Sequence, residues 1–338
     1  MNLFERNRID PFYIFGMGGD AKDWNKLRDN DNGIMKVIEN RIASLSNPKE
    51  REINLQKISE KLNGDGYFAS AFADSELMAL VVDLACRSNN PLALKVLRRG
   101  CERHVLVLNK TMTNYFEPIL SALIQEQHED LFLIIEAACR SSKWVRVIAN
   151  SRELVSFLSQ KPISRFSILE CIPLQAFQNN AVELCVAHLK QSKMPKLEAL
   201  RCLLALTFIP EAQDSAVALD AMNPILEIFS EMNRIPEEIL CCAVGVFSNL
   251  LQESSHCAKK QAKSANAHLS VCEILLNSDE EQLLRNALQA VSILASDSSM
   301  RNTLANKLDA RISDLSQHKS KLLATVALTA LDNVRWSP

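Results

Sequence analysis

The side chains best suited to chemistry in this sequence are four potential metal ligands, His256, Cys257, His268 and Cys272. Imidazole and thiolate are ligands that Zn²⁺ prefers, and His268 and Cys272, four residues apart, would share one helix face. The spacing fits no established zinc finger, however, and Cys272 also lies on the apolar side of its predicted helix. We therefore interpret this group as a buried thiol with surface histidines, and we predict no metal site.

The remaining reactive side chains form no catalytic frame. The six histidines fall in no Gly-x-Ser-x-Gly, His-Glu-x-x-His or similar pattern, and the carboxylates are spread along the chain. Residues 16–19 read Gly-Met-Gly-Gly, but no helix with Gly-Lys-Ser/Thr follows them, as a phosphate loop requires. The sequence therefore predicts a protein that is not an enzyme and has no cofactor.

The cysteines and the N-terminal residues bear on the cellular compartment. All ten cysteines lie in or beside apolar helical patterns, with irregular spacing and no Cys-x-x-Cys, as expected for buried reduced thiols. Residues 1–6 lack the apolar run of a secretory signal, and no stretch reaches the about 18 apolar residues of a membrane span. We expect a cytoplasmic or nuclear protein without a membrane partner.

Glycine usage restricts the fold class. The 338-residue chain has 47% hydrophobic residues but only eight glycines, and only Gly245 lies beyond Gly100. A β-sandwich needs glycine in its tight turns, and a nucleotide-binding fold needs it in its phosphate loops. Because 38 Lys+Arg nearly balance 40 Asp+Glu, the net charge of −2 gives no general reason to expect nucleic acid as a partner.

The elements that would hold these side chains are helices, and the prolines show that they repeat. Proline suits the first turn of a helix, and four prolines open apolar helical patterns: Pro91, Pro162, Pro195 and Pro236. A second set has the same phase, since Pro118 lies 27 residues after Pro91, and Pro224 lies 29 residues after Pro195. Two copies of one phase relation indicate an internal repeat.

This phase predicts long helices that recur about every 40 residues, and a helical repeat of that length is typical of an α-solenoid. One further long helix is expected to begin near 163. After the long helix at 280–296, we expect a short helix over 299–308 and then a third segment that ends at 317. The long helices are expected at 91–103, 129–141, 195–208, 236–252, 280–296 and 319–333. The residues expected to be buried between repeats are Leu203, Leu206, Val246, Leu250, Leu288, Val291, Leu294 and Leu328.

Three short passages carry a resemblance to a known family. Residues 280–297 look like an armadillo third helix, residues 246–250 (Val-Phe-Ser-Asn-Leu) match that helix's Ala-Leu-Ser-Asn-Leu signature, and residues 221–226 (Ala-Met-Asn-Pro-Ile-Leu) look like the start of a second helix. The chain thus resembles the armadillo-repeat family, with HEAT repeats as its near relative.

The resemblance implies an all-α fold, an armadillo-like right-handed superhelix of about seven three-helix repeats. We expect an irregular N-terminal arm at 1–33, capping helices at 34–90 and the repeat array at 91–338.

In the family, third helices line a concave groove, and a lane of asparagines along them grips the ligand. Here that lane holds Asn249 and Asn333, with Arg99 and Arg140 at earlier positions. The peptide-binding members carry an inward tryptophan four residues before the asparagine, where this chain has Gly245. The resemblance therefore implies the scaffold, while binding of basic localisation signals does not carry over.

The charges are unevenly distributed along the chain. Residues 87–110 and 139–165 each carry a net +5, whereas residues 210–238 carry −6. A solvated helix face explains any single cluster, but two basic clusters one or two repeats apart could also merge into one stripe that favours an acidic partner. The clusters lack stacking aromatics beyond Trp144, which disfavours nucleic acid.

The sequence thus predicts a non-catalytic scaffold or adaptor that binds a partner protein or peptide of acidic character along its groove. The alternatives are an obligate structural subunit of a larger complex and a regulator of a partner enzyme. The predicted partner-binding residues are Arg98, Arg99, Arg103, Arg140, Asn249, Arg285, Gln289 and Asn333.

Overall fold

The computed structural model describes residues 33–34, 36–45, 47–160, 165–191, 197–252 and 256–336. Within these ranges every regular element is a helix, which confirms the predicted all-α class. The predicted arm lies outside the described residues except for its last residue, Gly33. None of the helices in these ranges combines the length and the apolar character needed to cross a bilayer.

The chain divides into two compact units, unit 1 at 1–154 and unit 2 at 155–338. The described part of unit 1 begins with helical residues 33–34 and 36–45. Its numbered helices are α2 (Arg51–Leu62), α3 (Gly66–Ala73), α4 (Glu76–Cys86), α5 (Pro91–Arg103), α6 (Val105–Asn114), α7 (Phe116–Glu126), α8 (Glu129–Ala138) and α9 (Ser142–Asn150). The predicted division into capping helices and array stays a prediction.

Helix α10 (Arg152–Leu158) spans the border between the units. The helices of unit 2 are α11 (Phe166–Leu169), α12 (Pro173–Gln178), α13 (Ala181–Gln191), α14 (Leu197–Leu206), α15 (Pro210–Ala218), α16 (Met222–Ser230), η3 (Met232–Arg234), α17 (Glu237–Gln252), α18 (His256–Ser264), α19 (Ala267–Asn277), α20 (Glu281–Leu294), α21 (Ser298–Leu315) and α22 (Lys321–Arg335).

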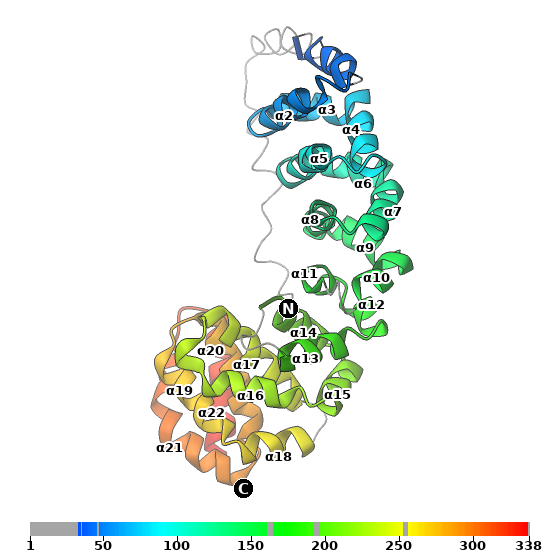
Figure 1. The fold of residues 1–338 in the computed structure, drawn as a ribbon. Helices are drawn as coiled ribbons and strands as arrows, with labels where there is room; N and C mark the ends of the chain where they lie inside the picture. Colours follow the sequence, from blue (N-terminus) through cyan, green and yellow to red (C-terminus); the bar gives the residue numbers. More distant parts are fainter. Residues whose placement is uncertain are drawn as a thin grey trace. The chain divides into compact units, whose positions relative to one another are not determined.

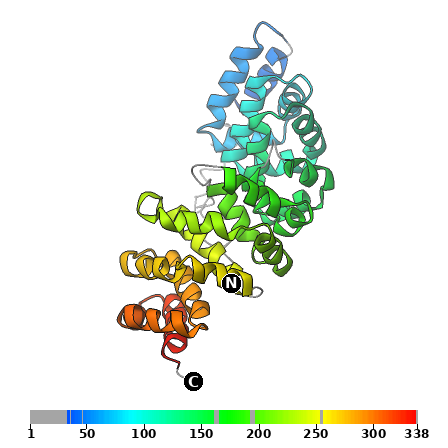
Figure 2. The ribbon, with the colours of Figure 1, turned by 60° about the horizontal axis from the view of Figure 1, so that its bottom comes forward.

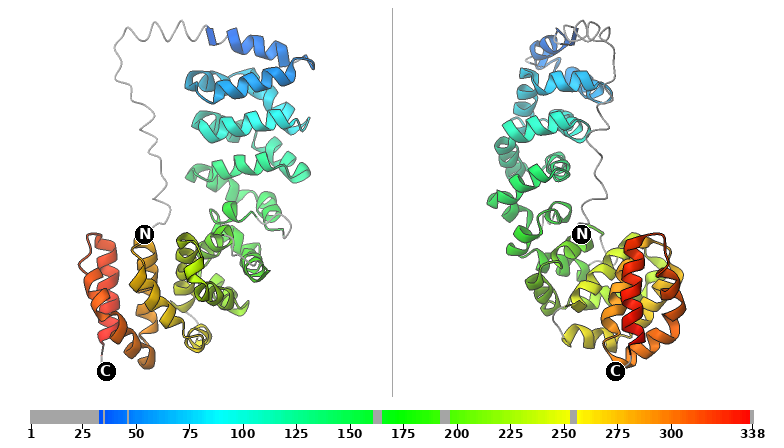
Figure 3. Two further views of the ribbon diagram at one scale, coloured as in Figure 1. Left: turned by 60° about the vertical axis from the view of Figure 1, so that its left-hand side comes forward. Right: turned by 180° about the vertical axis from the view of Figure 1, so that it is seen from behind.

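Within each unit the third helices of successive repeats pack against one another. In unit 1, α5 lies between α2 and α8 and contacts both (Figure 1). In unit 2, α14 contacts α11 and α17, and α20 contacts α17 and α22; Figures 2 and 3 show these helices layered in chain order. Because each layer covers the apolar face of the one before it, neighbouring repeats share one continuous core, as in a solenoid.

The six predicted long helices are confirmed as α5, α8, α14, α17, α20 and α22, with ends within a few residues of the prediction. The proline phase has the expected physical basis at α5, where Pro91 occupies the first turn and loses no hydrogen bond there. The Asn90 side chain accepts hydrogen bonds from the backbone N–H groups of Leu92 and Ala93, both at 3.0 Å, and caps the helix.

Two expectations about helix length are wrong. The helix expected from about 163 is only Phe166–Leu169 in the described chain, because Pro173 opens α12 and disfavours a helical conformation at Ile172. After α20, the chain forms one helix, Ser298–Leu315, in place of a short helix and a third segment. No glycine or proline stands inside this stretch to end the helix earlier.

Seven of the eight predicted core residues are buried, and Leu328 is not. Helix α22 packs on α20 and α21 through Ala327, Ala330, Leu331 and Val334. Leu328 follows Ala327 by one residue, so it turns about 100° away from that face and is 50% exposed.

Candidate partner-binding surface

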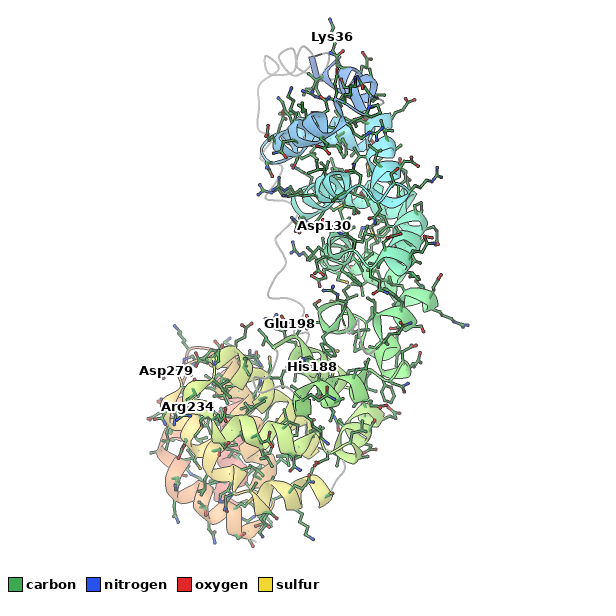
Figure 4. All side chains as sticks on the ribbon, in the orientation of Figure 1. Lys36, Asp130, His188, Glu198, Arg234 and Asp279 are labelled. Atoms are coloured by element: carbon green, nitrogen blue, oxygen red, sulfur yellow. The ribbon has the colours of Figure 1, made fainter. Side chains whose placement is uncertain are left out.

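Arg98, on the α5 surface that faces α8, is bound within unit 1. Its Nε atom lies 3.0 Å from Oδ1 of Asp130 in α8 and 3.9 Å from Oε1 of Glu102 (Figure 4 labels Asp130 between the two helices). The Arg98 and Asp130 side chains are only 25% and 17% exposed. The pair therefore joins two repeats, and the Arg98 charge is already compensated by carboxylates.

Arg99 and Arg103 reach in the opposite direction, to the preceding repeat. Arg99 Nη1 donates to Ser59 Oγ at 2.7 Å, and Arg103 Nη1 donates to the Asn63 carbonyl oxygen at 3.1 Å, each contact spanning 40 residues. Both acceptors are neutral, so these contacts orient the guanidinium groups without cancelling their charge. Arg140, two residues after α8, is exposed, and among the described residues no ion pair involves Arg99, Arg103 or Arg140.

Asn249, the signature asparagine of α17, is bound inside unit 2. It is 6% exposed, and its Nδ2 donates to Thr207 Oγ1 after α14 at 3.1 Å, across 42 residues. The amide that the family resemblance assigns to a ligand here joins two repeats. Asn333, at the other predicted asparagine position, is exposed on α22.

Gly245 shows why the family's tryptophan is absent from α17. A Cβ atom at this position would lie 2.9 Å from Leu204 Cδ1 and 3.0 Å from Asn286 Nδ2. Asn286 belongs to α20 and donates to the Cys241 carbonyl oxygen at 3.0 Å. Side chains of the two neighbouring repeats thus fill the space over the glycine, and the helices pack more closely than a larger residue would allow.

The predicted polar face of α20 is partly linked to itself. The Arg285 guanidinium donates to the Gln282 side chain, and Gln282 Nε2 donates to Asn286 Oδ1 at 2.9 Å. Ser292 Oγ donates a hydrogen bond to the Leu288 carbonyl oxygen at 3.0 Å, within the same helix. Gln289 is exposed, and it is the member of this predicted set that α20 presents to solvent.

Two of the four candidate metal ligands, His268 and Cys272, lie in surroundings that favour their uncharged forms. Burial raises the pKa of the Cys272 thiol to about 11 and that of Cys101 to about 12, which leaves little thiolate for nucleophilic attack or metal binding. His268, expected at the surface, is buried, and its pKa is lowered by burial and by the nearby Lys307. The His256 side chain lies outside the described residues. Over the described ranges no group of three or more potential ligands is close enough to hold a metal.

Sequence reasoning did not point to the exposed aromatic and apolar side chains. Phe208, two residues after the end of α14, is 59% exposed, and Val105 at the start of α6 is exposed to the same extent. A shallow depression of about 290 Å³ lies among α12, α13 and α15 in unit 2. Its lining residues are Phe177, Asn180, Val182, Glu183, Ser215, Ala218 and Leu219.

A scan against protein-family models finds no match, and a comparison with curated proteins finds none either. Among solved structures, the chain is similar to an engineered protein of the Northeast Structural Genomics Consortium, with 14% identity, a TM-score of 0.70, and coverage of 91% of this chain and 82% of that one. It is also similar to Uso1-2, with 15% identity, a TM-score of 0.54, and coverage of 78% and 51%.

A designed armadillo repeat protein matches with 13% identity and a TM-score of 0.41, covering 87% of this chain and 98% of that one. The likeness to the first engineered protein, together with third helices that stack repeat upon repeat, settles the fold. The chain is an α-solenoid of stacked helical repeats, the fold class that the armadillo resemblance implies.

Proposed function

We propose that this protein is a non-catalytic scaffold or adaptor that binds a partner protein or peptide through the third-helix surface of its repeats. The observation that supports this proposal most is the state of Arg99 and Arg140 in unit 1. Both occupy the lane that the resemblance assigns to ligand contact, and neither makes an ion pair within the described part of the chain. The contact between repeats thus compensates the Arg98 charge by an ion pair, whereas the charges of Arg99 and Arg140 are available to a partner.

The charge of this surface favours an acidic partner. Arg99 and Arg140 lie on adjacent repeats, and α5 packs directly against α8, so a carboxylate-bearing segment could meet both. Opposite charges across an interface raise the association rate and reject like-charged competitors. Cytoplasmic or nuclear acidic proteins are the partners that this proposal implies.

The proposal is tested with a partner purified with the protein from its native cell and then reconstituted from pure components. The double reversal Arg99→Glu with Arg140→Glu should weaken binding by about tenfold or more, since charge reversal replaces attraction with repulsion. The matched control is Arg87→Glu with Arg152→Glu, two exposed cations outside the third helices. Equal affinity of both double mutants, with folding confirmed by circular dichroism, would contradict the proposal.

A second candidate function, a structural subunit of a larger assembly, is favoured by the last helix of unit 2. Leu328 and Trp336 at α22 are 50% and 58% exposed, and large exposed apolar side chains of this kind can pack against another subunit. Light scattering on protein isolated under native conditions tests this candidate. A stable complex that dissociates on Leu328→Asp would support the subunit role, and a monomer would count against it.

A further inference from the structure

The junctions between third and first helices lie side by side in unit 1 and expose large apolar side chains. Helix α3 packs against α6. Tyr67 at the start of α3 is 52% exposed, and Val105 and Leu106 at the start of α6 are 59% and 51% exposed. The next residues, Phe68 and Val107, are buried, so the core is filled without the exposed side chains.

Cations lie beside these apolar side chains. The hydrogen bond from Arg103 to the Asn63 carbonyl oxygen places its guanidinium at the end of α2, close to the start of α3. Trp144 Nε1 of α9 donates to Asn109 Oδ1 of α6 at 2.7 Å, which holds α9 beside α6. Lys143 Nζ lies 4.2 Å from the centre of the Trp144 ring and is exposed, so it extends the same edge.

The acidic side chains nearest in sequence to this edge are already engaged. Asp65 caps α3 by accepting from the Phe68 backbone N–H at 2.9 Å, and Glu102 faces Arg98. Arg140, at the turn from α8 to α9, adds a further cation. We name this surface the α3–α6–α9 edge, and it consists of Tyr67, Arg103, Val105, Leu106, Arg140 and Lys143.

We propose that the α3–α6–α9 edge docks an acidic segment of a partner protein that carries regularly spaced apolar side chains. Packed helices lie about 8–10 Å apart, and an extended chain advances about 3.3 Å per residue. A segment that crosses α3 and α6 therefore presents an apolar side chain to each helix when about every third residue is apolar. The carboxylates between them meet Arg103, Arg140 and Lys143. This inference rests on the proposed function, because it requires a protein partner.

The test uses the full chain and a labelled synthetic peptide of repeating Glu-Glu-Leu units. Peptides of Glu-Glu-Ser and of Lys-Lys-Leu units remove the apolar and the acidic component in turn. Of the three peptides, only the Glu-Glu-Leu peptide should bind when measured by fluorescence polarisation. Its affinity should fall as salt is added, because salt screens the exposed charges.

The edge variant is Leu106→Asp with Lys143→Glu, and it should reduce affinity for the Glu-Glu-Leu peptide by about tenfold or more. The matched control is Ile53→Asp with Lys57→Glu on α2, which changes one exposed apolar residue and one exposed lysine of the same unit. The control should bind the peptide as the unaltered chain does.

Three results would overturn the inference: no binding of the Glu-Glu-Leu peptide, unchanged binding by the edge variant, or equal loss in the control. Edge-dependent binding to phosphatidylserine vesicles without peptide binding would assign the edge to membranes instead. The proposed function fails separately. If a reconstituted partner loses affinity on Arg99→Glu and keeps it in the edge variant, the scaffold proposal stands and the edge is rejected.

Discussion

At the scale of single residues, Gly245 decides how closely α14, α17 and α20 pack. Alanine would gain about 1 kcal/mol of helix propensity, but its Cβ would press on Leu204 and on Asn286 Nδ2. Displacing Asn286 breaks its bond to the Cys241 carbonyl oxygen, which costs about 1 kcal/mol, and overpacking costs about 1–3 kcal/mol. The propensity gain and the hydrogen-bond loss cancel, so we expect Gly245→Ala to lower the free energy of unfolding by about 1–3 kcal/mol.

Urea unfolding of Gly245→Ala, Asn286→Ala and the double mutant measures this coupling. In the Asn286→Ala background the alanine at 245 should cost less, because one of its two close contacts has been removed. Two results would show that Asn286 does not restrict this position. One is additive effects of the two substitutions on the free energy of unfolding, and the other is a Gly245→Ala protein stabilised by the full helix-propensity gain of about 1 kcal/mol.

His268 should make the stability of unit 2 depend on pH. Burial first, and Lys307 second, lower its pKa below the ordinary 6.5, so the unfolded chain takes up a proton more readily than the folded one. Its contribution is fully present above the unfolded pKa and is lost as pH falls below about 6.5 toward the folded value. The melting temperature of His268→Gln should therefore fall less than that of the unaltered chain between about pH 7 and pH 5. Parallel pH profiles of the two proteins would refute this assignment.

At the scale of elements, Asp297 both caps α21 and ties it to α18. Its carboxylate accepts from the Ser299 and Met300 backbone N–H groups at 2.9 and 3.2 Å and from Lys263 Nζ at 2.6 Å. The hydrogen bonds from Lys263 and Ser299 hold the pKa of this carboxyl well below its usual range, so its stabilisation is present above about pH 4 and declines as pH falls further.

We expect Asp297→Ala to cost about 1–2 kcal/mol through the lost cap, and Asp297→Asn to cost less than about 1 kcal/mol, because asparagine still caps and only the exposed ion pair is lost. Urea unfolding near neutral pH separates the two variants. If both cost the same, the ion pair and not the cap carries the stabilisation.

The repeat phase could be predicted from the sequence because prolines and apolar periodicity act locally. The length of α11 and the single helix α21 were missed. Helix α11 ends before Pro173, which opens α12, and α21 continues because no breaker interrupts it. At the candidate surface, Arg99 and Arg140 could be found from the lane alone. The partners of Arg98 and Asn249 could not, because Asp130 and Thr207 belong to neighbouring repeats and their pairing exists only in the stack.

At the scale of the whole molecule, the division into two compact units predicts that damage to one unit stays local. In a repeat array each layer contacts only its neighbours, so stability is close to a sum over layers. Leu294, buried at 1% exposure in α20, lies in unit 2, and Leu294→Ala should cost about 2–5 kcal/mol there. Hydrogen exchange should then accelerate in α17, α20 and α22, while the amides of α5 and α8 keep their protection. Equal loss of protection in both units would mean that the chain unfolds as one cooperative body, and that a partner bound on unit 1 would sense changes made in unit 2.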